Sequence, residues 1–425
     1  MIRLTPTVQC YHWGKPGSLS EVANLCSAGG MLETVEPTTT YAELWMGTHP
    51  KGPLRVHPTG QLLSEWLFAN QAAIGGKLAA QLVKTQTGDR KSIDLPLLFK
   101  AQAARLHESD PKNYPDSNHK PEMAIALTPF EMLCGFRPIN EIYEHVKDTP
   151  ELFELVGGEA FGDLEKVATD NSADVDEQKS RDALKCCFSK LMAQEELLVQ
   201  RNVHAMVERV ALRVKSDQER HQLTETDAKF VLGELIIRLN YHCPGDIGCF
   251  APFFLNHFIL QPGEACFLGP NEPHAYLFGD CIECMACSDN TIRAGLTPKF
   301  KDVRTLCDSL TYRMSPSDGN KFAPSVHPAD PRVTVYDPPV PEFAVHRIQL
   351  PTTGSPHPLL PLATCSILLV IQGVAKVDDH NDSTTLSRGH VWLVPARDTP
   401  VLLNVTTAPF LAFRAFTDEK NADQL

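Results

Sequence analysis

The sequence predicts a mainly β protein with an α-helical insert and a β-sandwich or jelly roll at its C-terminal end. Short apolar runs between proline and glycine turn signals occur up to residue 138 and again after residue 244. Between Pro138 and Pro244 there is only one proline, Pro150, and apolar residues recur at helical spacing. From residue 366 onward, short strands broken by glycine show no helical pattern, which is typical of a sandwich or jelly roll.

The helices are predicted from their apolar period. Residues 62–67, with a continuation to residue 82, combine leucine spacing with alanines that favour a helix. Residues 180–214 repeat apolar side chains close to every 3.6 positions, and residues 226–241 repeat the pattern after a Thr/Asp start that can cap a helix. These two stretches form the core of the predicted insert.

The strands are predicted from short apolar runs that lie between turn residues. A proline-rich stretch at 336–341 separates the strands after the insert from those of the C-terminal part. The predicted strands are 253–259, 275–278, 282–286, 303–306, 366–372, 374–377, 391–395 and 401–405.

Composition excludes several classes of protein. The 425 residues hold 39 Lys and Arg against 52 Asp and Glu, and the net charge of −13 argues against a nucleic-acid or other polyanion-binding surface. Thirteen cysteines, about 3 % of the chain, are too few for a disulfide scaffold. No secretory segment follows Met1, and the longest aliphatic run, Ile367 to Ile371, is too short to span a bilayer. A soluble cytoplasmic protein without a membrane partner is expected.

His274 is the first candidate for chemistry. A turn at Gln261-Pro262-Gly263 opens a strand, a second turn follows, and His274 begins the next strand. In small barrels this arrangement places an imidazole at the mouth, pointing inward, where a metal can bind. The alternative is a histidine that only makes structural hydrogen bonds.

Glu122 is the second candidate. Strand alternation puts Glu122, Ala124 and Ala126 on one face, and the small alanines leave room beside the carboxylate for a metal or a substrate. The alternative is an exposed carboxylate on an ordinary edge strand. Cys281, Cys284 and Cys287 have a spacing that resembles metal-cluster runs, but in a strand Cys284 points away from the other two, so core thiols are expected.

Cations follow this cysteine strand. Arg293 stands next to small Ala294-Gly295 and could reach into a cavity to offset developing negative charge, and Lys299 could bind a phosphate. The alternative is that both are solvated surface cations.

Together these residues resemble one family, the type I mannose-6-phosphate isomerases. The resemblance covers essentially the whole chain. The matching strings are residues 41–50 (Tyr-Ala-Glu-Leu-Trp-Met-Gly-Thr-His-Pro), 119–127, 135–138 (Gly-Phe-Arg-Pro), 244–248 (Pro-Gly-Asp-Ile-Gly), 273–299 and 337–341.

The resemblance implies a zinc enzyme that interconverts mannose 6-phosphate and fructose 6-phosphate through an enediolate and supplies mannose 6-phosphate for GDP-mannose synthesis. It implies a monomer. The expected domains are a catalytic cupin domain in two parts (1–138 and 245–320), a helical domain (139–244) and a C-terminal jelly roll (321–425). Residue by residue, Glu122 and His274 match zinc ligands and Arg293 matches the active-site arginine. Positions matching the phosphosugar pocket are Lys100, Lys120, Lys299, Trp13, Tyr276 and Glu283.

One departure from the family concerns the metal. The family follows its Leu-Pro-x-Leu-Phe-Lys strand with a second strand and a Gln-Ala-His-Pro motif that supplies two more zinc ligands. Here Lys100 runs directly into Ala101, so that about sixteen residues are absent from a site that needs at least three protein ligands. Gln102 and His107 are the residues that could substitute. The alternative to an isomerase is therefore a phosphosugar-binding relative with impaired catalysis, or a truncated gene model from which this segment was lost.

Overall fold

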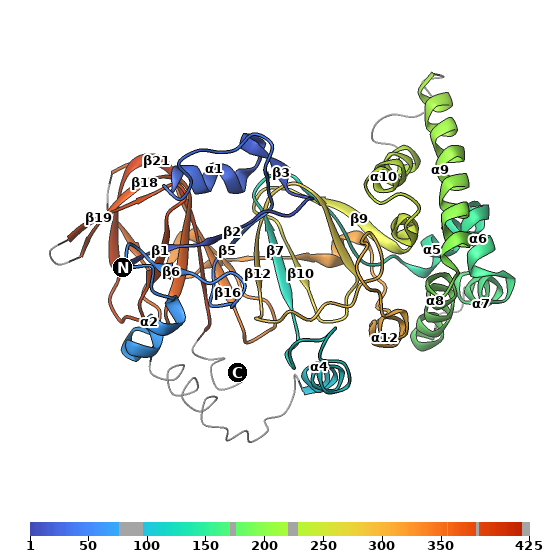
Figure 1. Cartoon of the computed structure of the whole chain (residues 1–425), viewed down its shortest axis with the longest axis horizontal. Coiled ribbons are helices and arrows are strands. Elements are labelled where there is room, and N and C mark those ends of the chain that lie inside the picture. The colour runs from blue at the N-terminus through green and yellow to red at the C-terminus, as the bar shows by residue number, and fades with distance from the viewer. Residues whose placement is uncertain (76–96, 171–175, 220–227, 355, 380–381, 419–425) are drawn as a thin grey trace. The chain divides into compact units, whose positions relative to one another are not determined.

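The computed structural model describes residues 1–75, 97–170, 176–219, 228–354, 356–379 and 382–418 (Figure 1). Its contacts divide the chain into two compact units. The first comprises Met1–Ala101, Glu283–Cys287 and Ala323–Leu425, and the second comprises Gln102–Ile282 and Ser288–Phe322. The domain boundaries predicted at residues 138, 244 and 320 come from the sequence pattern, whereas these two units are defined by contacts between residues. The predicted boundaries therefore stay a prediction.

The first unit is organised around one large antiparallel sheet. Its strands run in the order β14-β15-β16-β21-β18-β20-β1-β6, with β17 on β21 and β19 on β18. The bounds are β1 (Ile2–Thr5), β6 (Arg55–Val56), β14 (Ser325–His327), β15 (Asp330–Tyr336), β16 (Ala344–Leu350), β17 (His357–Leu359), β18 (Ser366–Asp379), β19 (Asp382–Ser387), β20 (Val391–Val394) and β21 (Val401–Phe416). The two ends of the chain meet in this sheet, because β1 pairs with β20 and places Leu4 opposite Val391.

Smaller elements complete the first unit. Helix α1 (Glu21–Ala28) begins where the Ser20 hydroxyl accepts the amide of Ala23. Helix α2 (Leu63–Ala69) confirms the helix predicted at 62–67, whereas the predicted continuation beyond residue 75 lies outside the described residues. Short strand pairs are β2 (Thr7–Gln9) with β5 (Glu43–Trp45), and β3 (Lys15–Pro16) with β4 (Thr40–Tyr41).

The β part of the second unit is a sandwich. The described strands form two sheets, in the orders β12-β7-β10-β13 and β11-β8-β9. Their bounds are β7 (Glu122–Ala126), β8 (Phe130–Phe136), β9 (Leu255–Leu260), β10 (Ala265–Leu268), β11 (His274–Phe278), β12 (Cys281–Met285, of which Glu283–Met285 are counted in the first unit) and β13 (Lys321–Phe322). Side chains from both sheets pack into one cluster, the sandwich core: Ala124, Ala126, Phe130, Met132, Cys134, Phe258, Leu260, Cys266 and Leu268.

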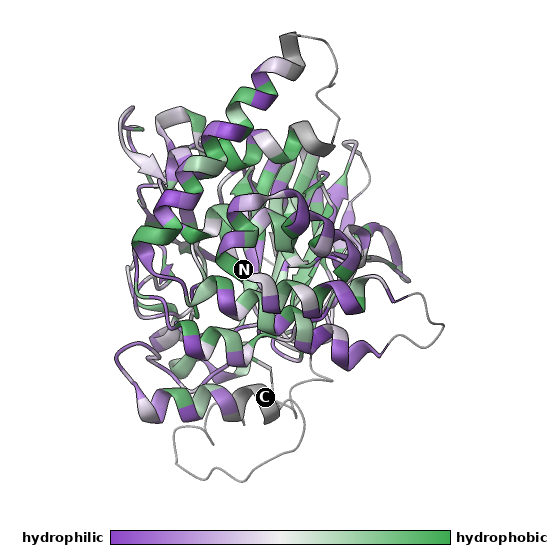
Figure 2. Ribbon diagram, turned by 90° about the vertical axis from the view of Figure 1, so that its right-hand side faces the viewer, coloured by the Kyte–Doolittle hydropathy of each residue, from purple (hydrophilic) through white to green (hydrophobic). Residues whose placement is uncertain are grey.

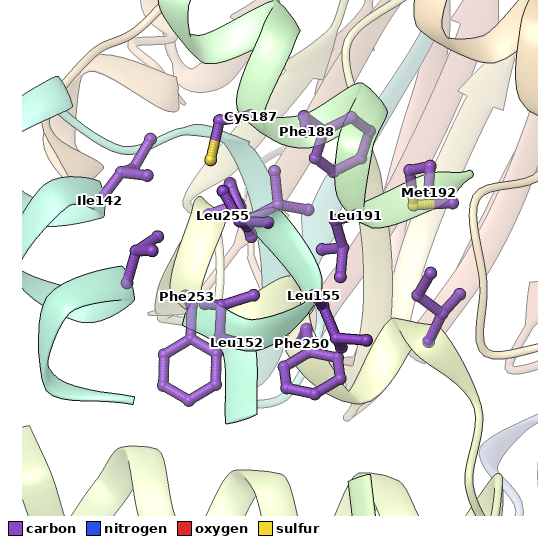
Figure 3. Packing of buried hydrophobic residues seen from close by; sticks show 14 of the residues in the cluster. Ile142, Leu152, Leu155, Cys187, Phe188, Leu191, Met192, Phe250, Phe253 and Leu255 are labelled. Atoms are coloured by element: carbon purple, nitrogen blue, oxygen red, sulfur yellow. The ribbon is translucent and has the colours of Figure 1, made fainter. Parts of the chain in front are cut away.

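Helices make up the rest of the second unit. Their bounds are α4 (Leu97–Ser109, which belongs to the second unit from Gln102 onward), α5 (Ile139–Asp148), α6 (Pro150–Val156), α7 (Gly158–Ala168), α8 (Glu177–Met192), α9 (Glu196–Glu219), α10 (Ala228–His242), α11 (Ala251–Phe254) and α12 (Val303–Ser309). Hydrophobic and hydrophilic residues alternate along the helical insert, as one buried and one exposed face require (Figure 2). The buried face includes Phe188 and Leu191 of α8, which share one hydrophobic cluster with Phe250 of the segment that follows the helices (Figure 3).

The helices predicted from periodicity are confirmed. Residues 180–214 lie in α8 and α9, and 226–241 corresponds to α10. The strand predicted at 303–306 is wrong, because these residues form α12, whose first turn is capped when the Asp302 carboxylate accepts the amide of Thr305. None of the helices in the described ranges combines the length and apolar character that crossing a bilayer needs.

Candidate functional site

Glu122 occupies the buried end of a core strand. Strand β7 lies between β12 and β10, and Glu122 itself is only 8 % exposed, which excludes an exposed carboxylate on an edge strand. The space expected beside it is not open, because Ala124 and Ala126 belong to the sandwich core. The carboxylate therefore lies where the apolar core ends.

His274 faces this carboxylate from the other sheet. It begins β11 opposite Cys134 of β8, a residue of the sandwich core, so its side chain lies on the inner face as predicted. Its Nε2 is 3.2 Å from Oε2 of Glu122, and its Nδ1 is 2.9 Å from the carbonyl oxygen of Glu272. The ammonium of Lys120 lies 3.0 Å from the other oxygen, Oε1, of Glu122.

These contacts set the charges of the cluster. Burial alone would raise the pKa of Glu122, but the hydrogen bond and charge of His274 and the charge of Lys120 outweigh it and hold that pKa below its usual range. Burial alone would lower the pKa of His274, but the hydrogen bond and charge of Glu122 raise it. At neutral pH the cluster is thus a buried carboxylate between two cations.

The donor set does not fit a zinc ion. Protein zinc sites use at least three protein ligands, and no group of three His, Cys, Asp or Glu side chains among the described residues could hold a metal. Glu122 and His274 instead contact each other, and both oxygens of the carboxylate face N–H donors. With only these two candidate ligands, the coordination shell stays incomplete among the described residues.

Gln102 and His107, the candidates to replace the missing zinc ligands, form hydrogen bonds with other groups. The side chain of Gln102 donates to the Ser309 hydroxyl at 2.5 Å and accepts from the Asn271 amide at 3.2 Å. His107 Nδ1 lies 2.7 Å from the carbonyl oxygen of Tyr114. The described structure thus provides no replacement ligand beside Glu122.

The cysteines do not provide an alternative metal site. Cys281 and Cys284 lie in β12, as the strand interpretation predicted, and Cys287 follows the strand. Within the described ranges no cysteine joins a group that could bind a metal.

Tyr276 lies beside this cluster. It follows His274 by two positions on β11, its ring centroid is 5.9 Å from that of His274, and its edge meets Phe130 at 5.1 Å. The side chain is 37 % exposed, so it forms an accessible wall next to the imidazole.

Arg293 and Lys299 lie on a loop of the same unit. Residues 286–302, all of them described, form neither helix nor strand. Arg293 is half-buried and lines a small hollow with Asn113 and Tyr114, whereas Lys299 is exposed. The half-burial of Arg293 argues against a freely solvated surface cation. The exposure of Lys299 is compatible both with phosphate binding and with a solvated surface cation.

The remaining predicted residues belong to the first compact unit. Lys100 lies in the first turn of α4 rather than in the strand that the family resemblance implies, and its side chain is outside the described set. Glu283 is half-buried on β12, and Trp13 is 58 % exposed with its ring 5.7 Å from that of Tyr11. The structure thus brings together Lys120, Glu122, His274 and Tyr276.

Two aspartates near this site were not predicted. Asp116 accepts hydrogen bonds from the Ser288 hydroxyl, the Asp289 amide and the Asn290 side chain, and so ties the start of the 286–302 loop to the segment before β7. Asp246 contacts the same loop further along. Asp246 lies in the Pro-Gly-Asp-Ile-Gly string, which was a signal of family membership but not of this role.

Comparison with known proteins identifies the family. A model described as phosphomannose isomerase type I, catalytic domain, matches residues 1–139; the helical insertion domain model matches residues 155–255, and the type I C-terminal model matches residues 334–378. The mannose-6-phosphate isomerase of Rattus norvegicus is 41 % identical over 433 residues, covering 97 % of each chain. The chain belongs to the type I phosphomannose isomerase family. The human mannose-6-phosphate isomerase is likewise 41 % identical, and that of Schizosaccharomyces pombe is 37 % identical and fully covered.

Solved structures confirm the fold of this phosphomannose isomerase family member. The apo form of mannose 6-phosphate isomerase from Salmonella typhimurium superposes with a TM-score of 0.72 at 24 % identity, covering 98 % of this chain and 99 % of that one. A structure of mannose 6-phosphate isomerase bound with zinc and yttrium gives the same score. The predicted fold class, a sheet-rich protein of cupin-like domains with a helical insert, is therefore confirmed.

Proposed function

We propose that this chain is an aldose–ketose isomerase that interconverts mannose 6-phosphate and fructose 6-phosphate. The observation that carries the proposal is the cluster of Lys120 and His274 around the buried carboxylate of Glu122, in a chain that is 41 % identical over 97 % of its length to a mannose-6-phosphate isomerase. In the cell such an enzyme supplies mannose 6-phosphate for GDP-mannose synthesis. We place it in the cytoplasm as a monomer, with a net charge of −13 that favours neither nucleic acid nor an anionic membrane surface as a partner.

The reaction asks for proton transfer and charge stabilisation. A base removes the proton from C2 of mannose 6-phosphate, the C–H electrons form a C1–C2 double bond, and the carbonyl oxygen becomes an oxyanion. The C2 hydroxyl then passes its proton to the C1 oxyanion, and the abstracted proton returns to C1, so that C2 becomes the ketone and C1 carries a hydroxyl. Within the proposed pocket, the guanidinium of Arg293 offsets the oxyanion charge, and Glu283 is the proposed proton-transfer group.

Phosphate binding is the other task. The proposed phosphate-binding side chains are Lys100, Lys120 and Lys299, whose charges contribute affinity at a point remote from the reacting carbons. Tyr276, beside His274, would form a wall for the sugar. Together these residues would hold the substrate by its phosphate while the chemistry takes place at C1 and C2.

A second candidate is a phosphosugar-binding protein with impaired turnover. One observation favours it: Glu122 and His274, which match zinc ligands of the family, contact each other and lack a third metal-binding partner among the described residues. The reaction steps above therefore include no step through zinc.

Turnover by the purified full chain separates the two candidates. The isomerase proposal expects mannose 6-phosphate to be converted to fructose 6-phosphate, and expects a Glu283→Gln variant to lose at least about tenfold in kcat, because an amide cannot accept the proton. Binding of mannose 6-phosphate without conversion, with and without added zinc, would establish the second candidate. Near-normal turnover by Glu283→Gln would remove Glu283 from the proton-transfer role.

A further inference from the structure

The loop of residues 286–302 carries two proposed site residues without the support of regular secondary structure. Arg293 and Lys299 both lie on it. A binding group has to be held within about half an ångström of its productive place to be effective, so a loop site needs fixed points. The contacts of the loop show where these points are.

The middle of the loop is held by Asp246. Its Oδ1 accepts the backbone amide of Leu296 at 2.6 Å and the backbone amide of Gly248 at 2.7 Å. Its Oδ2 lies 3.2 Å from the ammonium of Lys301. The Asp246 side chain is only 13 % exposed, so these charge-assisted hydrogen bonds are well shielded from water.

The bend that Asp246 holds is strained. Leu296 has a φ of 56°, a left-handed conformation that is unfavourable for a residue with a side chain. Close packing surrounds it, since a Cβ on Gly295 would come within 2.8 Å of both Asp246 Oδ1 and the backbone of Gly248. A bend of this kind persists only when surrounding contacts enforce it, and the hydrogen bond to the Leu296 amide is such a contact.

The position of the bend connects it to the site. Leu296 lies three residues after Arg293 and three residues before Lys299. The start of the loop is fixed separately by Asp116, and its end by Asp302, which accepts the hydroxyl of Tyr114 at 2.9 Å. Asp246 is therefore the carboxylate that sets the path of the loop between the two cations.

We infer that Asp246 is a positioning residue, which fixes the bend at Leu296 and thereby holds Arg293 and Lys299 in place for an anionic phosphosugar. This inference rests on the proposed function, because it takes Arg293 and Lys299 as substrate-binding residues. Asp246 itself acts through the loop and does not contact the substrate.

Three variants of the full-length chain test the inference. Asp246→Ala removes all the hydrogen bonds of the carboxylate. Asp246→Asn keeps an Oδ1 that can accept both backbone amides and loses only the charge towards Lys301. The matched control is Asp176→Ala, because Asp176 also accepts two backbone amides, those of Gln178 and Lys179, but does so at the start of α8 without contact to the loop.

Binding of mannose 6-phosphate, measured by titration calorimetry at a temperature where every variant is folded, is the readout. We expect Asp246→Ala to weaken binding about tenfold, Asp246→Asn to stay within about threefold of wild type, and Asp176→Ala to bind like wild type despite a lower melting temperature. Hydrogen exchange of the 286–302 peptides should rise in Asp246→Ala alone.

The measurements distinguish a failure of the proposed function from a failure of the inference about Asp246. If the wild-type chain does not bind mannose 6-phosphate, the proposed function fails and the inference falls with it. If the wild type binds and folded Asp246→Ala binds equally well, the inference alone is overturned. An equal loss of affinity in Asp176→Ala would also overturn it, since the effect would then follow stability rather than the loop.

Discussion

His274 Nε2 lies 3.2 Å from Oε2 of Glu122, close enough for the two side chains to satisfy each other without a metal. Lys120 takes the remaining carboxylate oxygen. In a complete zinc site these donors would be directed at the ion, and a third ligand would complete the shell. The contact is consistent with a chain that lacks the segment that carries further ligands in its family.

We predict that the purified chain retains far less than one zinc ion per molecule. Two protein ligands do not hold the ion against dialysis, because affinity depends on ligand number and geometry. Metal analysis after loading with zinc and dialysis is the measurement. The control is a variant in which the Gln-Ala-His-Pro segment of the family pattern is inserted between Lys100 and Ala101, and it should retain about one ion. Full zinc retention by the unmodified chain would contradict the prediction.

Replacing Lys120 by Met should lower the free energy of unfolding by about 1–3 kcal/mol. The ammonium offsets the charge of Glu122, a buried carboxylate, and its loss leaves that charge with a single cationic partner. Urea unfolding at neutral pH measures the change. Lys185→Met is the matched control, because Lys185 pairs with Asp308 on the surface and should matter little. Equal midpoints for Lys120→Met and wild type would show that this ion pair contributes nothing to stability.

Glu131 should make stability depend on pH in the acid range. Burial would raise its pKa, but hydrogen bonds from His257 at 2.7 Å and Arg238 at 2.6 Å lower it from 4.5 to about 2. A carboxyl with a depressed folded-state pKa contributes stability above its unfolded value of 4.5, and the contribution is lost as pH falls from there towards 2. Glu131→Gln should therefore be on the order of 2 kcal/mol less stable at pH 7.

The difference in the free energy of unfolding between wild type and Glu131→Gln should shrink below pH 4.5, because protonation of Glu131 removes the stability that its carboxylate contributes to the wild type. Unfolding curves from pH 7 to pH 3 make the comparison. Glu144→Gln serves as the control, because Glu144 forms only an exposed ion pair with Lys147. A deficit of constant size across this pH range would rule out the linkage.

Phe136→Ala should be among the most destabilising single substitutions in the second unit. Phe136 is fully buried, stacks on Tyr312 at 5.3 Å and meets Phe188 edge-on at 5.5 Å. Truncating a buried phenylalanine costs about 3–5 kcal/mol through lost burial and the cavity left behind. Thermal unfolding should show a drop of several degrees, whereas Phe278→Ala, at a position 63 % exposed, should change the melting temperature little. A similar drop in both variants would show that Phe136 has no special place in the core.

The helical insert was predictable because its signal is local. Side chains such as Leu184, Phe188 and Leu191 repeat over many turns and do lie on the buried face. The same approach failed at 303–306, because a run of only four residues fits the period of a helix as well as that of a strand. The signal that indicates a helix there is Asp302, which caps its first turn. Nothing local marks the pairing of β1 with β20, since it joins residues nearly 400 positions apart.

The site was predictable only in part. Strand alternation and turn signals suggested inward-facing Glu122 and His274, and the structure places them in contact. The partners that hold the site residues, Lys120 on Glu122 and Asp246 on the 286–302 loop, depend on side-chain contacts between distant segments. Sequence spacing carries no record of such contacts, although Asp246 did stand inside a family string.

The pairing of β1 with β20 has a consequence for how the chain is made. On the ribosome, Ile2–Thr5 emerge long before their neighbours Val391–Val394 are synthesised. One edge of β1 pairs early with β6, but the edge that faces β20 stays open until Val391–Val394 are made, whereas most strands of the second unit already have their partners by then. A good yield of this protein thus requires that the unpaired edge of β1 is protected, either by a chaperone or by rapid completion of synthesis. In a circular permutant that begins within the 286–302 loop, β20 and β1 would be synthesised close together, so that β1 would pair with β20 soon after it emerges.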